Sequence, residues 1–302
     1  MKVGVVGVGS MGQNHARIYS GMKGVDLVGV VDSDAARGKW VAETYKTKAL
    51  SDYRDLLREG IDAVSVVVPT SLHFEVASFF LKNGVDCLVE KPITPSLEEG
   101  KALVDLAKEH GKKLMVGHIE RFNPAVQKAK QIIQEGLLGK VLIISTRRVG
   151  PYSPRITDVG IIIDLATHDI DVARYLTGKE PNDIWSAYGS IKHTKEDHAL
   201  LLLDFGGCAA CVEVNWFTPH KVRTAVITGT GGIAYMDYIE QALTVYNSEW
   251  KMEPKIEKEE PLKNELKHFV ECVTTGKEPL VNGEEGLKTL GVALKSLQKM
   301  PK

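Results

Sequence analysis

Six residues near the start of the chain have the spacing of a phosphate-binding loop. The segment Gly7-Val8-Gly9-Ser10-Met11-Gly12 matches G-x-G-x-x-G, with a β-branched run before it and a helical pattern after it. The first glycine permits a tight turn, the second lets a pyrophosphate approach the backbone, and the third lets the helix pack against the strand. The helix N-terminus offers free N–H groups and a partial positive charge. We therefore expect Gly7, Gly9, Ser10, Met11 and Gly12 to bind a dinucleotide.

An acidic residue at the end of the second apolar run indicates which dinucleotide this is. Asp32 follows Gly12 by about twenty residues, where a carboxylate accepts hydrogen bonds from ribose hydroxyls. Its charge would repel the 2′-phosphate of NADP, although Arg37 nearby is a cation of the kind that can accept this phosphate. We expect NAD rather than NADP, with Ser33 beside Asp32 in the same site.

Two residues in the second half of the chain have the types that proton transfer requires. Asp164 and His168 are four positions apart in a helical pattern, so they share one helix face. Histidine is a natural base because its ordinary pKa is about 6.5, and a nearby carboxylate can orient the ring or raise its basicity. The alternative for His168 is a capping or core role.

The first 120 residues alternate between short apolar runs and helical segments. The runs at 3–6, 25–31, 63–68, 87–89 and 114–116 predict strands, and the segments at 10–20, 34–45, 72–83 and 97–110 predict helices. The strand runs are nearly all apolar, which is typical of parallel strands covered on both faces. This alternation predicts a doubly wound parallel sheet, a Rossmann domain that binds NAD(P), over residues 1–120.

The pattern changes after residue 120. A helix is predicted after Asn123-Pro124 and another over 161–176, while the strand candidates lie at 140–148, 199–205, 208–216, 223–228 and 232–236. Two helices close the chain. We expect an α+β domain over residues 121–302, with a large, open, mostly antiparallel sheet that binds substrate and mediates oligomerisation. Val212, Val214 and Trp216 are predicted to bury one sheet face against another subunit, in a homodimer or homotetramer.

Composition excludes several classes of protein. The chain has 302 residues with 43% hydrophobic and 25% charged residues, enough for about two globular domains. A net charge of -1 argues against a nucleic-acid partner. There is no signal-peptide pattern, no apolar run of about 18 residues and no metal-ligand motif, so we expect a cytoplasmic protein without a metal or membrane partner. Cys208 and Cys211 are expected to be structural cysteines.

Three motifs in one order resemble a known family. Val68-Pro69-Thr70-Ser71-Leu72-His73 ends one strand run, Glu90-Lys91-Pro92 ends the next, and Asp164 with His168 forms D-x-x-x-H later in the chain. Together they resemble the Gfo/Idh/MocA family of oxidoreductases. The resemblance implies that Lys91, Asp164 and His168 are catalytic, and that Lys91-Pro92 is a cis peptide. It also implies that Pro69, Thr70, His73, Glu90 and Lys91 line the nicotinamide and ribose.

The implied chemistry is oxidation of a secondary alcohol by hydride transfer to nicotinamide. In one assignment His168 takes the hydroxyl proton and Lys91 donates to the developing oxygen; in the other Lys91 carries the proton and His168 holds the substrate. One feature departs from the family pattern. Many members have several glycines before the D-x-x-x-H helix, whereas this chain has only Gly160 there, so the loop beside the substrate is expected to differ.

Two further segments bear on the substrate. Residues 117–124 include His118 and Arg121, and residues 147–155 include three arginines and Tyr152. Arginine suits phosphate or carboxylate, so His118, Arg121, Arg148, Tyr152 and Arg155 are predicted to bind substrate together with the catalytic residues. Structural ion pairs or subunit contacts are the alternative for these arginines. The segments are similar to those of the family branch that oxidises UDP-N-acetylglucosamine at the 3-hydroxyl.

Two other functions stay open at this point. The same family includes dehydrogenases of myo-inositol and free aldoses, which are neutral substrates, and it includes NAD(P)-sensing regulatory proteins that catalyse no reaction. A sensor has no need of the combination of Lys91, Asp164 and His168, which this chain has.

Overall fold

The chain folds into two compact units. The computed structural model describes residues 1–153 and 159–298. Unit 1 consists of Met1–His118 together with Leu262–Lys288, and unit 2 consists of Ile119–Pro261 together with the residues from Thr289 onward. Residues 262–288, which the sequence grouped with the second domain, thus pack with the first unit. No helix of the described residues is long and apolar enough to span a bilayer.

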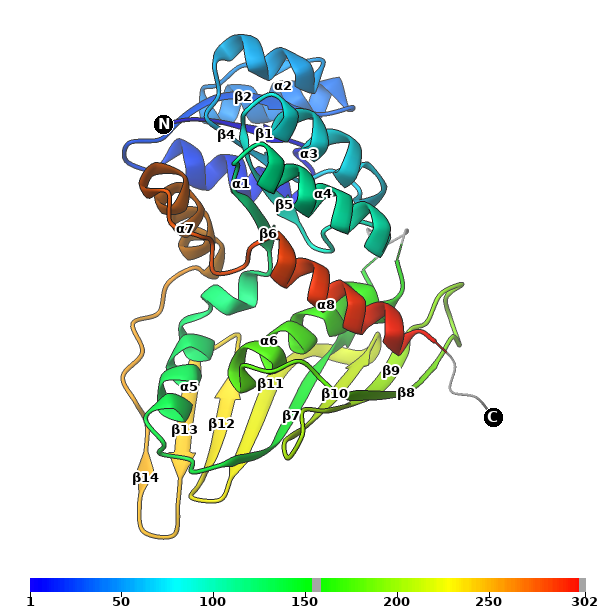
Figure 1. Cartoon of the computed structure of the whole chain (residues 1–302), viewed down its shortest axis with the longest axis vertical. Coiled ribbons are helices and arrows are strands. Elements are labelled where there is room, and N and C mark those ends of the chain that lie inside the picture. The colour runs from blue at the N-terminus through cyan, green and yellow to red at the C-terminus, as the bar shows by residue number, and fades with distance from the viewer. Residues whose placement is uncertain (154–158, 299–302) are drawn as a thin grey trace. The chain divides into compact units, whose positions relative to one another are not determined.

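Unit 1 alternates strands with helices (Figure 1). Its elements are β1 (Lys2–Val6), α1 (Ser10–Ser20), β2 (Asp26–Val31), α2 (Ala35–Tyr45), β3 (Ala49–Leu50), η1 (Tyr53–Glu59), β4 (Ala63–Val66), η2 (Thr70–Leu72), α3 (His73–Lys82), β5 (Asp86–Glu90), α4 (Leu97–Glu109), β6 (Leu114–Gly117) and most of α7 (Pro261–Thr275). The short strand β3 and the 3₁₀ helix η1 lie in a region that the sequence pattern left without a prediction.

The six strands of unit 1 form a sheet in the order β3-β2-β1-β4-β5-β6. All of its pairs are parallel, and this order is the one in which a Rossmann sheet reverses direction between β1 and β4. The strands β4 and β6 are buried at every position, because helices cover both faces. The predicted doubly wound sheet is confirmed.

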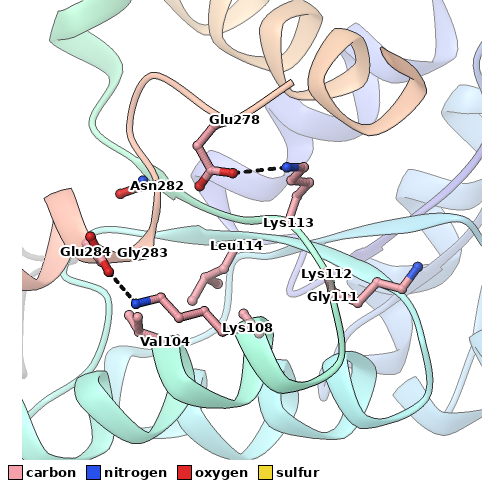
Figure 2. A pocket seen from close by; sticks show the side chains of 11 residues that line it. Val104, Lys108, Gly111, Lys112, Lys113, Leu114, Glu278, Asn282, Gly283 and Glu284 are labelled. Atoms are coloured by element: carbon pink, nitrogen blue, oxygen red, sulfur yellow. Dashed lines mark hydrogen bonds and ion pairs between the residues drawn. The ribbon is translucent and has the colours of Figure 1, made fainter. Parts of the chain in front are cut away.

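A crevice of about 380 Å³ lies within unit 1, between α4, β6 and the segment that joins α7 to α8 (Gly283–Ser296). Two ion pairs cross it: Lys108 with Glu284, and Lys113 with Glu278, whose Nζ and Oε2 atoms are 3.0 Å apart (Figure 2). These pairs tie the returning segment to the Rossmann sheet, and they leave the crevice lined by charges that are already matched.

Unit 2 is built around a larger sheet. Its elements are η3 (Ile119–Phe122), α5 (Pro124–Gln134), β7 (Val141–Pro151), η4 (Ile162–Ala166), α6 (Thr167–Thr177), β8 (Asp183–Gly189), β9 (His198–Asp204), β10 (Ala209–Asn215), β11 (Phe217–Gly229), β12 (Ile233–Asp237), β13 (Ala242–Tyr246) and β14 (Lys251–Met252). The Asn123 side chain caps α5 by accepting from the N–H of Ala125, and Pro124 occupies the first helical position, as predicted.

The eight strands are ordered β14-β13-β12-β11-β7-β10-β9-β8. All neighbours are antiparallel except β7 and β10, so the expected mostly antiparallel sheet is confirmed. Helices α5 and α6 pack on one face of it (Figure 1). We call this the helix-covered face, and the other the open face.

The prediction for the open face named the wrong residues. Val212, Val214 and Trp216 are buried on the helix-covered face. The alternate positions of the strands carry the exposed apolar residues instead, and strand register aligns Trp185, Leu202, Cys211, Ser145, Val226 and Tyr235 in one row across the open face. Leu202 and Tyr235 are 44% and 48% exposed. The sequence showed the alternation but not which parity faces the helices.

Candidate functional site

The glycine loop connects β1 to α1 with the geometry that a phosphate loop needs. Gly7 has a φ of +86°, and a Cβ there would lie 2.4 Å from the carbonyl oxygen of Val67. A Cβ on Gly12 would lie 1.9 Å from the carbonyl oxygen of Gly7, so only glycine permits this helix–strand approach. A Cβ on Gly9 would meet nothing within 4 Å. The loop is therefore tight at both ends and open in the middle.

The open side of this loop faces a cavity of about 600 Å³ within unit 1. Gly7, Gly9, Asp32, Ser33 and Pro69 are among the residues that line it. No side chain caps the N-terminus of α1, where Gly9 is the capping residue and Ser10 and Met11 form the first turn. Helix N–H groups without a side-chain acceptor beside a cavity fit the pyrophosphate of a dinucleotide.

Asp32 at the end of β2 is held by four hydrogen bonds. Its Oδ2 accepts from the N–H of Val8 at 2.8 Å and from Arg37 Nε at 3.1 Å, and its Oδ1 accepts from the N–H of Asp34 at 2.8 Å and from Arg37 Nη2 at 2.7 Å. Burial would raise the pKa of Asp32, but these bonds, led by that from Arg37, hold it below its ordinary value. The carboxylate is thus ionised and already paired with Arg37.

The residues that follow β4 divide into exposed and buried ones. Pro69 is exposed and Thr70 is half-buried, whereas His73 is buried. The His73 ring nitrogens lie 2.9 Å from the carbonyl oxygen of Pro92 and 3.0 Å from that of Val68, and burial lowers the pKa of His73. His73 was predicted to line the cofactor; in the structure its buried ring connects the loop after β4 to the loop after β5.

The residues after β5 hold Lys91 at the carboxyl edge of the sheet. The Lys91–Pro92 peptide bond is cis, as the resemblance implied, and Lys91 is half-buried. Glu90 Oε1 lies 3.1 Å from Nε2 of the buried His15 on α1. Burial would raise the pKa of Glu90, but His15 and Lys91 lower it. His15 was not expected at the site, since nothing in the local sequence links α1 to β5.

Asp164 and His168 lie on consecutive turns of unit 2, but not on a uniform α-helix. Asp164 belongs to the π-helical turn η4, and His168 lies in the first turn of α6; both are half-buried. A π turn inside a helix shifts the side chains that follow it relative to the preceding turn, and such turns are frequent at functional sites. Sequence spacing alone indicates a shared face and does not reveal this turn.

Gly160, the single glycine before this helix, packs closely against the Glu196 side chain. A Cβ on Gly160 would lie 2.1 Å from the Glu196 carboxylate. That carboxylate accepts from the N–H of Ile162 at 3.2 Å, and the Glu196 carbonyl accepts from the N–H of Ile161 at 2.9 Å. In this chain the helix that carries Asp164 thus begins beside a carboxylate, that of Glu196.

Arg148, predicted to bind substrate, is internally paired. Its side chain is 2% exposed, and its Nε and Nη2 donate to Asp169 at 2.8 and 3.2 Å, while its Nη1 donates to Glu120 at 2.8 Å. Burial would lower the pKa of Arg148, but Asp169 and Glu120 hold it above its ordinary value. Arg148 thus forms structural ion pairs, which was the alternative to a substrate-binding role.

The other basic residues of these two segments differ in burial and in pairing. Arg121 is buried and forms two hydrogen bonds with Asp171, of 2.8 and 2.7 Å. Arg147 is half exposed on the open face, where it pairs with Glu213 at 3.1 Å. His118 is buried at the end of unit 1. Arg155 lies outside the described residues, so its predicted role stays a prediction.

Tyr152 belongs to an aromatic cluster at one end of the unit 2 sheet. Its ring stacks on His193 with centroids 3.9 Å apart, and it meets the Trp216 ring edge-on with centroids 5.1 Å apart. Asp197 organises the loop that carries His193 by accepting from the N–H groups of residues 191, 192 and 193. Tyr152 was predicted to bind substrate; in the structure its ring is stacked on a histidine.

The sequence matches one family in both units. Residues 1–118 match an oxidoreductase family with an NAD-binding Rossmann fold, GFO_IDH_MocA, and residues 126–235 match the GFO/IDH/MocA C-terminal domain. The chain is 32% identical to UDP-N-acetylglucosamine 3-dehydrogenase of Acidithiobacillus ferrooxidans over 97% of this chain and 95% of the relative. It is 34% identical to the scyllo-inositol 2-dehydrogenase (NAD(+)) of Bacillus subtilis over 97% and 92%.

A solved structure supports the same relationship. The A. ferrooxidans UDP-N-acetylglucosamine 3-dehydrogenase superimposes with a TM-score of 0.91 and covers 98% of this chain and 96% of its own. The glycine loop, the Glu90-Lys91-Pro92 strand end and the helix with Asp164 and His168 occur together in a chain that is similar to these enzymes over its whole length. The chain belongs to the Gfo/Idh/MocA family of oxidoreductases.

Proposed function

We propose that this protein is an NAD-dependent dehydrogenase that oxidises a secondary hydroxyl of a sugar, with a nucleotide sugar such as UDP-N-acetylglucosamine as its substrate. The observation that carries this proposal is full-length similarity to a dehydrogenase of that substrate, in a chain that has Lys91, Asp164 and His168. An NAD-sensing role without catalysis has no use for this set of residues.

NAD would be held by groups that unit 1 presents at the carboxyl edge of its sheet. The free N–H groups at the start of α1 would bind the pyrophosphate. Asp32 would accept hydrogen bonds from the ribose hydroxyls when the Arg37 side chain moves away from its carboxylate. Pro69, Thr70, Glu90 and Lys91, all at the carboxyl ends of strands, are proposed for the nicotinamide side. Bound NAD supplies the hydride acceptor.

Three side chains are proposed to manage the proton and the substrate oxygen. His168 accepts the hydroxyl proton, since a neutral imidazole is a base near neutral pH. Asp164 orients the ring and favours its charged form. Lys91 donates to the oxygen on which negative charge develops, and electrostatic stabilisation of that charge lowers the barrier.

A second substrate is favoured by a specific observation. The scyllo-inositol 2-dehydrogenase is 34% identical to this chain over nearly its whole length, and its substrate is a neutral polyol. Two of the arginines that favoured an anionic substrate, Arg121 and Arg148, are paired inside the protein. An inositol is therefore the competing candidate.

The test measures NADH formation at 340 nm with UDP-N-acetylglucosamine, scyllo-inositol and myo-inositol in parallel. Lys91→Ala and His168→Ala should each lower kcat at least a hundredfold on the true substrate. Lys82→Ala and His110→Ala, which remove exposed residues of the same types, are the matched controls. Wild-type turnover of an inositol alone would reject the nucleotide sugar, and full activity of Lys91→Ala would reject the mechanism.

The open face of the unit 2 sheet is proposed to bury against a second copy of the chain, in a homodimer or homotetramer. Ile143, Leu200, Leu202 and Tyr235 on that face are 44–49% exposed, which is unusual for large apolar residues of one sheet.

A further inference from the structure

Arg223 on β11 lies directly opposite Arg148 of β7 in the antiparallel register. Ala225 and Ile227, the next residues of the same parity on β11, are buried under the helices, so Arg223 points to the helix-covered face. It is half-buried, unlike the fully buried Arg148. No sequence motif surrounds Arg223, so the local sequence predicts no role for it.

The charged groups around Arg223 are Arg148, Glu120, Asp169 and Asp164. Asp169 uses both of its oxygens to bind Arg148, and Glu120 binds Arg148 through Oε1 and Asn123 through Oε2. Two of the three acidic neighbours are therefore engaged by other groups. The third, Asp164, is the proposed catalytic carboxylate.

The Arg223 guanidinium makes no hydrogen bond or ion pair with any residue that the structure describes, whereas Arg121, Arg148 and Arg174 of the same unit each bind carboxylates closely. Burial, and the charge of Arg148 beside it, lower the pKa of Arg223, and these effects outweigh the carboxylates of Glu120, Asp169 and Asp164, which raise it. A half-buried cation without a matched anion is costly, and an anionic ligand would remove that cost.

We infer that Arg223 binds an anionic group of the substrate, a phosphate or a carboxylate, next to the proposed catalytic Asp164. This inference rests on the proposed function and deepens it. Arg223 would take the substrate-binding role predicted for Arg148 and Arg121, since a planar guanidinium with free donors matches an oxyanion in two-point geometry.

The experiment compares Arg223→Met with the wild type at saturating NADH, by titration with UDP-N-acetylglucosamine, D-glucuronate and myo-inositol. We expect Arg223→Met to weaken at least one anionic ligand tenfold or more and to leave myo-inositol binding unchanged. Loss with UDP-N-acetylglucosamine identifies a phosphate, and loss with glucuronate identifies a carboxylate. Arg223→Gln, which keeps a polar group at this position, repeats the test if Arg223→Met does not fold by circular dichroism.

Arg147→Met is the matched control, because Arg147 lies on the neighbouring strand and faces the opposite side of the sheet. It should leave all three ligands unaffected. Unchanged affinity of Arg223→Met for both anionic ligands, an equal loss in Arg147→Met, or failure of the wild type to bind either anion would overturn the inference. A loss of kcat alone, with unchanged affinity for the anions, would show that Arg223 serves only Asp164 and would also overturn it.

This outcome is separable from failure of the proposed function. NADH binding to unit 1 and turnover of myo-inositol do not depend on an anion site. If the wild type turns over UDP-N-acetylglucosamine and Arg223→Met binds it and D-glucuronate with unchanged affinity, the dehydrogenase proposal stands and the Arg223 inference falls. If the wild type neither binds NADH nor turns over any of the three compounds, the proposed function falls.

Discussion

Replacement of Arg148 by methionine is expected to destabilise unit 2 strongly. Arg148 holds two carboxylates, Asp169 and Glu120, whose side chains are 1% and 13% exposed. Methionine fills much of the same space but leaves both carboxylates without their cation. The helix α6, which carries His168 next to Asp169, would lose its ion pair with β7.

The magnitude follows from the burial of this group. Removal of one partner of a buried ion pair costs about 3–5 kcal/mol, because the remaining charge is left uncompensated in a medium of low polarity. The free energy of unfolding of a domain is about 5–15 kcal/mol, so the variant should lose about a fifth or more of its stability. The neighbouring Arg147 pairs with Glu213 at the surface, and Arg147→Met should cost less than about 1 kcal/mol.

The assay is urea unfolding followed by tryptophan fluorescence. Trp185, Trp216 and Trp250 lie in unit 2 and only Trp40 lies in unit 1, so the signal reports mainly on the unit that contains Arg148. The expected result is a much lower free energy of unfolding for Arg148→Met than for Arg147→Met.

A second substitution separates charge from packing. The Arg148 guanidinium also lies 4.9 Å from the centre of the Tyr238 ring, so part of the loss is packing. If uncompensated charge dominates, Asp169→Asn in the Arg148→Met background should restore at least about 1 kcal/mol. A similar cost for Arg147→Met and Arg148→Met, or no recovery in the double variant, would refute the electrostatic explanation.

Three further outcomes are expected. Burial would raise the pKa of Asp197, but hydrogen bonds from backbone N–H groups and a histidine lower it to about 2. The pKa of an aspartate in the unfolded chain is about 3.9. Ionised Asp197 therefore stabilises the fold above about pH 4, and this stabilisation is lost as the pH falls toward 2. Between pH 5 and pH 3 the wild type should therefore lose about 1 kcal/mol more than Asp197→Asn in urea unfolding, and equal losses would contradict this. Arg37→Gln leaves the charge of Asp32 unmatched, so it should weaken NADPH binding at least fivefold and NADH binding less than twofold. Fluorescence titration measures both affinities, and an equal loss of affinity for NADPH and NADH would contradict this prediction. Leu202→Asp on the open face should convert the oligomer to a monomer in light scattering, and a monomeric wild type would disprove the interface.

Local sequence patterns predicted the parts of the protein that depend on neighbouring residues. The glycine spacing at residues 7–12 requires one backbone path, because Gly12 has no room for a side chain beside Gly7. The run of apolar residues in each short strand predicted a parallel sheet covered on both sides, and Asp32 followed at the expected distance. The Glu90-Lys91-Pro92 motif marked a strand end that the structure places at the carboxyl edge of that sheet.

Contacts between distant segments were beyond the reach of these patterns. The sequence showed that residues 147–155 are rich in arginine, but it could not show that Arg148 meets Asp169 from α6 while Arg147 points to the open face. Alternate residues of a strand face opposite sides of the sheet, and only the position of the helices determines which of the two sets is buried. The same reason explains why Val212 and Val214 were assigned to the wrong face.

The sequence by itself determined that this chain has the glycine loop of a dinucleotide-binding Rossmann domain and the residue types for hydride transfer, because those features depend on motifs of a few adjacent residues. Only the tertiary structure decided which charged side chains form ion pairs inside the protein and which do not. Arg148 and Arg223 are of the same residue type and are paired in register, yet one is matched by two carboxylates and the other by none within the described residues. That difference arises from segments far apart in the chain, and the free energy of a charge depends on what surrounds it rather than on its neighbours in sequence.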